Sequence, residues 1–348
     1  MYDQDSTAVT TALQGAQSTI FSDETINLIL SLTTSQSNTS VTFETASPDV
    51  NGNVTVAAGA EVVYIASSDT VQTTVKAPVN APVVIFQGKG GVIATINDGP
   101  ATVVGHANGV VDRIVVGSSG NDQIIVQDAK DTKIILGSGN SSVTTGYGID
   151  TVEAGLGNSS IVGGNGDYSV VKLAGAAANY QVTVNDGRAI VTNSTTNITT
   201  DISKIQYVQL DNGKALIFAK DSVEAAISTL YHTAFGRDAD AGGLDYWFDL
   251  GRAGGSLKQI ANHFTHSAEF VQVNELSNNA FVQGLYQNTF NRAGEDAGVA
   301  FWTDSLTHGA TRADLILSFS QLAAQNIDAS IHTEATVVGS VTIVTGII

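Results

Sequence analysis

Apolar residues recur every nine positions between Val116 and Val170, in the most regular pattern of the chain. The series is Val116, Ile125, Ile134, Val143, Val152, Ile161 and Val170, and Gly-x-Gly pairs keep the same period at Gly137/Gly139, Gly146/Gly148, Gly155/Gly157 and Gly164/Gly166. Such a period predicts one short strand and one tight turn per unit, stacked so that the apolar residues bury each other. We expect the glycines to supply positive φ angles and to let neighbouring backbones approach closely.

Short β-prone runs precede this repeat, from about residue 41 to residue 116. They include Val62–Ile65, Val83–Phe86 and Val92–Ile96, and turn residues separate them. β-prone runs bounded by turn residues predict strands. We therefore assign residues 41–116 to an irregular β-solenoid or β-rich region, and residues 117–172 to a roll of nonapeptide units.

The first 40 residues contain an apolar stretch with two interpretations. Ser22-Asp-Glu-Thr predicts a helix start ahead of Ile26, Leu28 and Leu30. The stretch either caps the first turn of the solenoid or forms an arm that pairs with the sheet of another subunit. On the second interpretation, Ile26, Leu28 and Leu30 are assembly residues.

Residues 173–220 alternate apolar and polar positions around turns such as Asn185-Asp-Gly187. This pattern predicts antiparallel hairpins, which would cap the open end of the roll. From Asp221 the periodicity becomes helical, and Tyr246-Trp247 aligns with Phe301-Trp302 in a second internal repeat, 55 residues apart. Residues 221–328 are therefore assigned to a two-repeat α-helical domain.

The final segment, residues 329–348, is uncharged and β-prone after Glu334. An exposed segment of this kind favours strand addition. It has two interpretations, which are compatible: an uncleaved secretion signal, and a strand that docks onto another subunit. On the second interpretation, Val341, Ile343 and Val344 are assembly residues.

The amino-acid composition limits the classes of partner that we expect the chain to bind. Acidic residues outnumber Lys and Arg by 33 to 15 in the 348 residues, for a net charge of −18. This negative charge disfavours binding to nucleic acid and to anionic membranes, and it favours binding of divalent cations. The absence of cysteine excludes disulfides and thiol chemistry. No window reaches the roughly 18 apolar residues of a membrane helix, so we expect no membrane insertion.

The nonapeptide units resemble the glycine- and aspartate-rich repeat of secreted bacterial calcium-binding proteins, the RTX family, with its pattern G-G-x-G-x-D-x-U-x, where U is apolar. The unit Thr145-Gly146-Tyr147-Gly148-Ile149-Asp150-Thr151-Val152 keeps the aspartate, whereas Ser141 and Ser159 replace it in the neighbouring units. The resemblance implies a right-handed parallel β-roll in which calcium lies between turns, held by aspartates and backbone carbonyl groups.

Alternate units fall on opposite edges of a two-unit turn. One edge then stacks Asn121, Asn140 and Asn158, and the other stacks Asp131, Asp150 and Asp167. Because calcium prefers hard, charged oxygen ligands, the expected calcium-site residues are Asp122, Asp131, Asp150, Asp167, Gly148 and Gly166. A metal-free roll with solvated acids is the open alternative. On the asparagine edge we expect side-chain-to-backbone hydrogen bonds.

The helical module, Gly236-Arg-Asp-Ala-Asp-Ala-Gly-Gly-Leu-Asp-Tyr-Trp247 and its second copy, resembles a domain of unknown function. That domain recurs in secreted calcium-repeat proteins and surface-layer-like bacterial proteins. Proteins of the calcium-repeat family leave the cell by the type I route with an uncleaved C-terminal signal. The resemblance therefore implies a secreted or cell-surface location, and the start Met1-Tyr-Asp-Gln-Asp, which lacks the features of a signal peptide, agrees with it.

No motif nominates a catalytic site, since neither His-Glu-x-x-His nor Gly-x-Ser-x-Gly is present. We expect a mainly β fold, a right-handed parallel β-roll or β-solenoid with an antiparallel cap, plus an all-α C-terminal domain. The predicted function is that of a secreted calcium-binding structural protein, not an enzyme, which polymerises with itself through its termini into an extracellular filament or surface layer. The alternatives are a calcium-dependent adhesin for carbohydrate, such as cell-surface polysaccharide, and then a secreted hydrolase or lyase.

Overall fold

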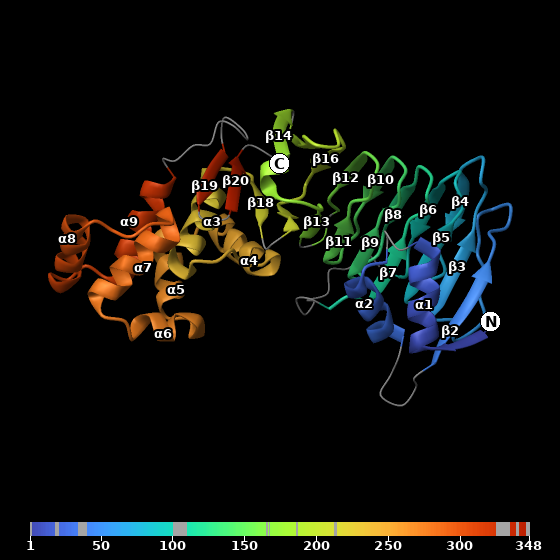
Figure 1. Cartoon of the computed structure of the whole chain (residues 1–348), viewed down its shortest axis with the longest axis horizontal. Helices are drawn as coiled ribbons and strands as arrows, with labels where there is room; N and C mark the ends of the chain where they lie inside the picture. The colour runs from blue at the N-terminus through green and yellow to red at the C-terminus, as the bar shows by residue number, and fades with distance from the viewer. Residues whose placement is uncertain are drawn as a thin grey trace. The chain divides into compact units, whose positions relative to one another are not determined.

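The computed structural model describes residues 2–17, 21–33, 40–99, 110–164, 166, 168–185, 187–211, 214–324, 335–338 and 341–345. The chain divides into two compact units, whose elements are labelled in Figure 1. The first unit comprises Met1–Leu173 and Ile190–Ile205, and the second comprises Ala174–Ala189 and Gln206–Ile348. In the described part of the chain, no helix has the length and apolar character needed to cross a membrane.

Two sheets of mainly parallel strands form the first unit (Figure 1). Within this unit one sheet has the order β1-β2-β3-β5-β7-β9-β11-β13 and the other contains β16-β12-β10-β8-β6-β4, so that consecutive strands from β3 to β13 alternate between the sheets. The strands are β1 (Tyr2–Asp5), β2 (Ser40–Ala46), β3 (Val62–Ala66), β4 (Thr73–Lys76), β5 (Val83–Gln87), β6 (Val92–Ile96), β7 (Arg113–Val116), β8 (Gln123–Val126), β9 (Thr132–Ile135), β10 (Ser141–Thr144), β11 (Asp150–Glu153), β12 (Ser159–Val162), β13 (Ser169–Lys172), β15 (Arg188–Asn193) and β16 (Thr199–Ser203). Strand β1 is antiparallel to β2.

The centre of the nine-residue apolar ladder is confirmed. Ile134 pairs with Val152 in one sheet, and Val143 pairs with Ile161 in the other. All four residues are at most 1% exposed. The period of nine therefore places one apolar residue per strand into the space between the two sheets.

At its ends the ladder differs from the prediction by one residue. The paired residues are Val115, Ile124 and Val171, instead of Val116, Ile125 and Val170. The spacing from Ile124 to Ile134, and from Ile161 to Val171, is ten residues instead of nine. Because successive side chains of a strand point to opposite faces, a shift of one residue moves the predicted member to the other face.

The repeat glycines let successive turns stack backbone against backbone. A Cβ on Gly137 would lie 1.8 Å from the carbonyl oxygen of Ser118, and a Cβ on Gly155 would lie 1.8 Å from that of Gly137. None of the repeat glycines from Gly137 to Gly166 has a positive φ, so that part of the prediction is wrong. Glycine is needed here for close approach instead of turn conformation.

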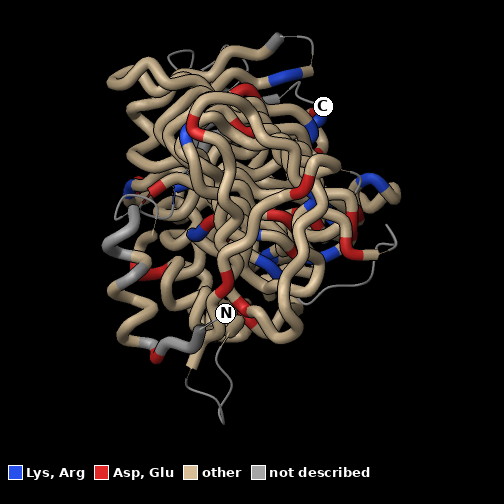
Figure 2. The backbone as a smooth tube through the Cα atoms, turned by 90° about the vertical axis from the view of Figure 1, so that its right-hand side faces the viewer, with Lys and Arg blue, Asp and Glu red and all other residues tan. Residues whose placement is uncertain are grey.

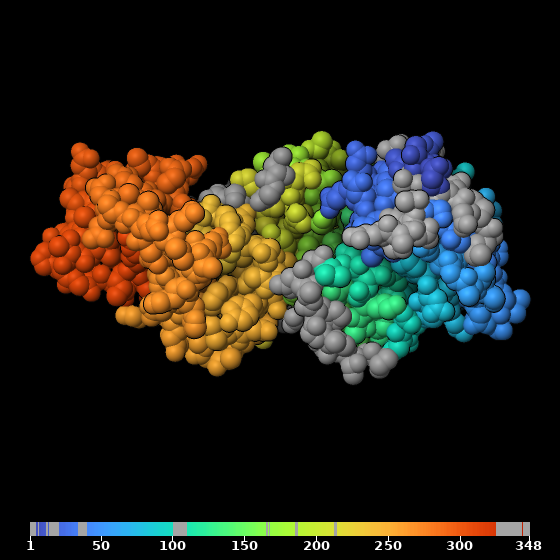
Figure 3. All heavy atoms as spheres, turned by 90° about the horizontal axis from the view of Figure 1, so that it is seen from below, coloured from blue at the N-terminus to red at the C-terminus, as the bar shows by residue number. Residues whose placement is uncertain are grey.

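Two N-terminal helices, α1 (Ser6–Gln17) and α2 (Asp23–Thr33), cover the outer face of the first sheet. Figure 3 shows this segment in blue, against the strands that follow it. Val9, Leu13, Ile26 and Ile29 of the helices, with Phe21 from the segment between them, are buried. They share one core with residues of the strands, namely Val41, Phe43, Val62, Val83, Ile85, Ile114, Val116 and Ile135. The N-terminal region is therefore a helical cover over the chain's own sheet face, with β1 added at the sheet's end.

The second unit combines a small sheet with helices. Its strand order is β17-β18-β20-β19, in which β17 and β18 form an antiparallel pair, as predicted for this region, and β18 and β20 are parallel. The strands are β14 (Tyr180–Asn185), β17 (Tyr207–Gln209), β18 (Ala215–Ala219), β19 (Ala335–Val338) and β20 (Val341–Thr345). The helices are α3 (Ser222–Phe235), α4 (Ala241–Arg252), α5 (Leu257–Thr265), α6 (Val271–Asn274), α7 (Asn278–Phe290), α8 (Asp296–Thr307) and α9 (Arg312–Ala323), with the short 3-10 helices η1 (Ala177–Asn179) and η3 (Ala268–Phe270).

The geometry of the aromatic residues confirms the 55-residue repeat. The rings of Tyr231 and Phe264 meet edge to face with centroids 5.5 Å apart, and their counterparts Tyr286 and Phe319 do the same at 5.0 Å. α3, α4 and α5 thus form a first copy, and α7, α8 and α9 form a second.

The helix ends repeat as well. The third helix of each copy starts with a capping box, at Ser256 and at Thr311, which confirms these two residues as N-caps. The first helix of each copy ends at a residue with left-handed backbone, Gly236 in one copy and Asn291 in the other.

Candidate functional site

Asp122 closes a turn from inside the first unit. It is 2% exposed. Its Oδ2 accepts a hydrogen bond from the backbone N–H of Ser118 at 2.8 Å, and its Oδ1 accepts from the Ser118 hydroxyl at 2.6 Å and the N–H of Val92 at 3.0 Å. Burial raises the pKa of Asp122, and these hydrogen bonds offset the rise only in part.

Asp150 repeats this arrangement in the other sheet. It is fully buried, and its Oδ2 accepts from the N–H of Gly146 at 2.6 Å while Oδ1 accepts from the N–H of Thr132 at 2.9 Å. Burial raises the pKa of Asp150 to about 7, against the lowering effect of the two hydrogen bonds. Like Asp122, Asp150 binds the N–H group four residues earlier and that of a neighbouring turn.

Asp131 belongs to a ladder along the aspartate edge. The N–H of Asp131 donates to Oδ2 of Asp112 at 3.0 Å, and Oδ1 of Asp131 accepts from the N–H of Ile149 at 2.7 Å. Each carboxylate therefore ties its turn to the next one. Asp131 is 2% exposed, so it is not the solvated acid of the metal-free alternative.

The asparagine edge forms the side-chain-to-backbone hydrogen bonds that were predicted for it. Asn121 Oδ1 accepts from the N–H of Asn140 at 2.8 Å, and Asn140 Oδ1 accepts from the N–H of Asn158 at 2.9 Å. The ladder continues from Asn158 Oδ1 to the N–H of Thr199 at 2.9 Å. All three asparagines are exposed.

A buried ion pair on the aspartate side was missed in the sequence. Arg113 holds both oxygens of Asp128, at 3.0 Å through Nη1 and 2.8 Å through Nη2, and donates to the hydroxyl of Thr132. Burial alone would raise the pKa of Asp128, but the hydrogen bonds and charge of Arg113 hold it below its usual value. The one signal of this ion pair in the sequence was Arg113 itself, a basic residue within an apolar run.

A calcium ion at the predicted residues would need free oxygen atoms around it. Calcium takes roughly 6–8 oxygen ligands. The carboxylate oxygens of Asp122 and Asp150 already accept hydrogen bonds, and in the described part of the chain no three His, Asp or Glu side chains are grouped to hold a metal ion. Gly148 and Gly166 lie in stacked turns, where a Cβ on Gly166 would be 2.7 Å from the Gly148 carbonyl oxygen, and Asp167 lies outside the described residues. Calcium binding at these residues stays a prediction, in which the ion would have to replace the backbone N–H groups that Asp122 and Asp150 accept.

Two of the predicted assembly residues, Ile26 and Ile343, lie within the chain's own cores. Ile26 is 2% exposed, and Leu28 and Leu30 pack partly buried against the same core. Ile343 is fully buried in the core of the second unit. Val341 and Val344 are backbone members of β20, which pairs with β18 of the same chain.

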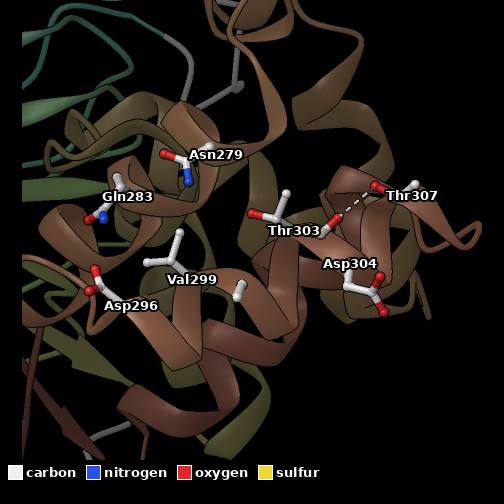
Figure 4. Close-up of a pocket in the computed structure, with 8 residues that line it drawn as sticks. Asn279, Gln283, Asp296, Val299, Thr303, Asp304 and Thr307 are labelled. Carbon is white, nitrogen blue, oxygen red and sulfur yellow. Dashed lines mark hydrogen bonds between the residues drawn. The ribbon is translucent and has the colours of Figure 1, made fainter.

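Several grooves are open on the described surface, and two of them lie along repeated elements. One, of about 430 Å3, follows the asparagine ladder and is lined by Gln72, Asn121, Gln123, Asn140, Ser142 and Asn158, among others. The other, of about 530 Å3, lies between α7 and α8 of the second helical copy. Figure 4 shows its labelled side chains, with Asn279 and Gln283 from α7 and Val299, Thr303 and Asp304 from α8.

Charged residues of both signs are spread along the backbone. Figure 2 shows acidic positions throughout the trace, with basic ones between them. Several basic residues fasten elements inside a unit: Lys133 pairs with Glu153 at 3.2 Å beneath α2, and Lys172 pairs with Glu24 of α2 at 3.4 Å. Basic residues therefore serve to join elements within the first unit.

Comparisons with known proteins bear on the helical repeat. Residues 218–274 and 261–326 each match the family model described as "Domain of unknown function (DUF4214)". No calcium-binding repeat family is identified for the nonapeptide units. No curated protein and no solved structure matches the chain. Over residues 218–326, the chain is thus similar to a domain family whose function is not known, in line with the resemblance drawn from its Tyr-Trp repeat.

Proposed function

We propose that this chain is a secreted structural protein, without catalytic activity, that assembles with copies of itself into an extracellular filament or surface layer. The observation that carries the proposal is the pair of hydrogen-bonded ladders across successive turns, through Asn121, Asn140 and Asn158 on one edge and Asp112 and Asp131 on the other. Ladders of this kind resist separation of the turns, which suits a stiff building block.

We interpret the two parallel sheets more specifically as the two faces of a β-roll. The alternation of consecutive strands between the sheets supports it, as does the backbone-to-backbone stacking at the repeat glycines. In repeat architectures each unit contacts only its neighbours, so the body grows in one direction and leaves two ends.

Free strand edges support self-assembly. In the described part of the chain, β1 and β19 each end the strand order of a unit, and each pairs on one side only. An edge strand presents unpaired N–H and C=O groups to a strand of another chain. Because β1 and β19 lie near the two termini, we propose a homopolymer that is joined through its ends.

Calcium binding stays a prediction. Asp122 and Asp150 would have to exchange hydrogen bonds for the ion, and Asp131 would have to release the N–H of Ile149. We therefore propose that calcium acts at the joints between copies and not within the described turns. A secreted location rests on the resemblance to exported repeat proteins.

One observation favours the adhesin as the second candidate. The groove along the asparagine ladder presents amides and hydroxyls, such as those of Gln123 and Ser142, at the regular spacing of neighbouring strands. A repeating array of donors and acceptors suits the hydroxyl groups of a polysaccharide.

Light scattering with negative-stain microscopy tests the proposal on the purified full chain, first with a chelator and then during calcium titration. Ordered filaments or layers support the structural function, and their dependence on calcium decides whether the ion takes part. A charge on the edge strand, in Thr336→Lys, should abolish assembly, whereas Val50→Lys, at a fully exposed position, should not. A folded monomer under all conditions would sink the proposal, and binding to polysaccharide would then support the adhesin.

A further inference from the structure

The two copies of the helical repeat differ at one groove. In the second copy, α7 and α8 leave about 530 Å3 open between Asn279, Val299, Thr303 and Asp304 (Figure 4). This volume lies within the roughly 300–1,000 Å3 of ordinary ligand sites. The same place in the first copy is found 55 residues earlier, between α3 and α4.

Side chains fill that place in the first copy. Phe248, the counterpart of Thr303, is fully buried. Arg252, the counterpart of Thr307, lies with its guanidinium carbon 5.9 Å from the centroid of the Phe248 ring. Its Nη2 pairs with Glu224 at 2.8 Å and its Nη1 pairs with Asp249 at 2.8 Å. A ring stacked under a guanidinium group, which is held by two acids, therefore closes the gap between α3 and α4.

The second copy keeps part of this frame but lacks the two groups that close it. Threonine stands at both positions, Thr303 for the phenylalanine and Thr307 for the arginine. Asp304 keeps the place of Asp249, and its partner is the exposed His308 at 3.2 Å. The Oγ1 of Thr303 is inaccessible to solvent and has no hydrogen-bond partner among the described residues.

We propose that the α7–α8 groove binds a peptide segment of a partner protein that presents an aromatic side chain beside an arginine. The ring takes the place that Phe248 fills in the first copy, against Val299, and the guanidinium group takes the place of Arg252, beside Asp304. This surface goes beyond self-assembly, because its occupant is a different protein.

Charge complementarity favours a basic partner over a second copy of this chain. The groove is lined by Asp296 and Asp304 and by no Lys or Arg. The chain itself carries a net charge of −18, so two copies repel each other at this surface, whereas a basic segment is attracted. Arginine also fits better than lysine, because its planar guanidinium group stacks on a ring while it binds a carboxylate.

The probe for this site is the capped dipeptide N-acetyl-Phe-Arg-amide, titrated into the full chain and followed by calorimetry and by NMR shifts of the groove residues. Saturable binding should appear in the roughly millimolar range expected of so small a ligand. The matched dipeptides N-acetyl-Phe-citrulline-amide, without the charge, and N-acetyl-Ala-Arg-amide, without the ring, should each bind at least about tenfold more weakly.

Two variants make the result specific to the groove. Thr303→Phe with Thr307→Arg rebuilds the packing of the first copy, so it should keep the fold and lose binding of the dipeptide. Asp304→Asn keeps the size of the side chain and should bind the arginine and citrulline dipeptides equally. The proposal is overturned by non-saturable binding, by equal binding of arginine and citrulline to the wild type, or by undiminished binding to the filled variant.

Discussion

The two edges of the parallel sheets tie their turns together with different chemistry. Along one edge, the exposed amides of Asn121, Asn140 and Asn158 each accept one backbone N–H. Along the other edge, carboxylates do this work, and two of them, Asp131 and Asp150, are at most 2% exposed. Both edges join one turn to the next, but in the described part of the chain the aspartate edge buries three carboxylates, those of Asp128, Asp131 and Asp150, and the asparagine edge buries one, that of Asp122.

The difference indicates which substitutions should destabilise the fold most. An exposed amide is neutral, and water replaces its hydrogen bond at little cost if the side chain is lost. A buried carboxylate needs a cation or a proton, since charge is costly in a medium of low polarity. Asp128 has the cation, Arg113, and Asp150 has the raised pKa that favours the proton.

Removal of the cation should have the largest effect. In Arg113→Met, Asp128 would keep its buried charge and lose both of its bonds to the guanidinium group. Breaking a buried pair from one side typically costs about 3–5 kcal/mol. Urea unfolding followed by circular dichroism should show this loss in the β signal. The fluorescence of Trp247 and Trp302 reports the helical repeat separately and should change little.

The matched control is the exposed pair of Lys172 and Glu24, whose side chains are 29% and 75% exposed. Lys172→Gln should cost less than about 1 kcal/mol, because water screens an ion pair at the surface. If Arg113→Met were no more destabilising than Lys172→Gln, burial would not set the contribution of these ion pairs to stability.

The pH dependence of stability should show a smaller effect than the loss of Arg113, and it arises from the aspartate edge. Asp150 has a folded pKa of about 7, raised from 3.8 by burial, so between these values the folded state holds a proton that the unfolded state has lost. Stability should therefore fall as the pH rises through this window, by at most about 1.4 kcal/mol per pH unit from this group. Below the window the proton is bound in both states, and the stabilisation is then complete.

Asp150→Asn measures this contribution by difference. Urea midpoints of the wild type and the variant, taken at a series of pH values across the window, should differ most in their slope, because the amide does not titrate. The absolute stability of the variant is a separate matter, since its amide N–H2 group faces the N–H of Gly146 or Thr132. Parallel curves would show that Asp150 is already ionised at the acidic end of the window.

The regular part of the fold could be predicted from the sequence, and its irregularities could not. The period of nine identifies Ile134, Val143, Val152 and Ile161 as one apolar ladder because a strand and a turn repeat at fixed length. A fixed period of nine cannot reveal the residue that is added before Ile134. Two neighbouring apolar residues stand there, and either of them would fit the period equally well. Only the pairing of strands decides between them.

The candidate sites were predicted less well, for a related reason. An aspartate in a Gly-x-Gly-x-Asp unit indicates an oxygen ligand, but whether its oxygens are free depends on which N–H groups of the neighbouring turn reach them, as Thr132 reaches Asp150. In the helical repeat, the offset of 55 residues was plain, whereas the exchange of Phe248 for Thr303 gained meaning only when α7 and α8 were seen to leave a groove.

The asparagine ladder should show the smallest effect. Asn140→Ala removes the acceptor for the N–H of Asn158, which water can replace because Asn140 is exposed, so we expect a loss of about 0.5–1.5 kcal/mol in the free energy of unfolding. Asn140→Asp keeps an acceptor oxygen and should lose less than the alanine variant. Hydrogen exchange at Asn158 measures the ladder directly and should accelerate in Asn140→Ala alone. If Asn140→Ala destabilised the sheets as much as Arg113→Met, the exposed edge would be as essential to the stacked turns as the buried one.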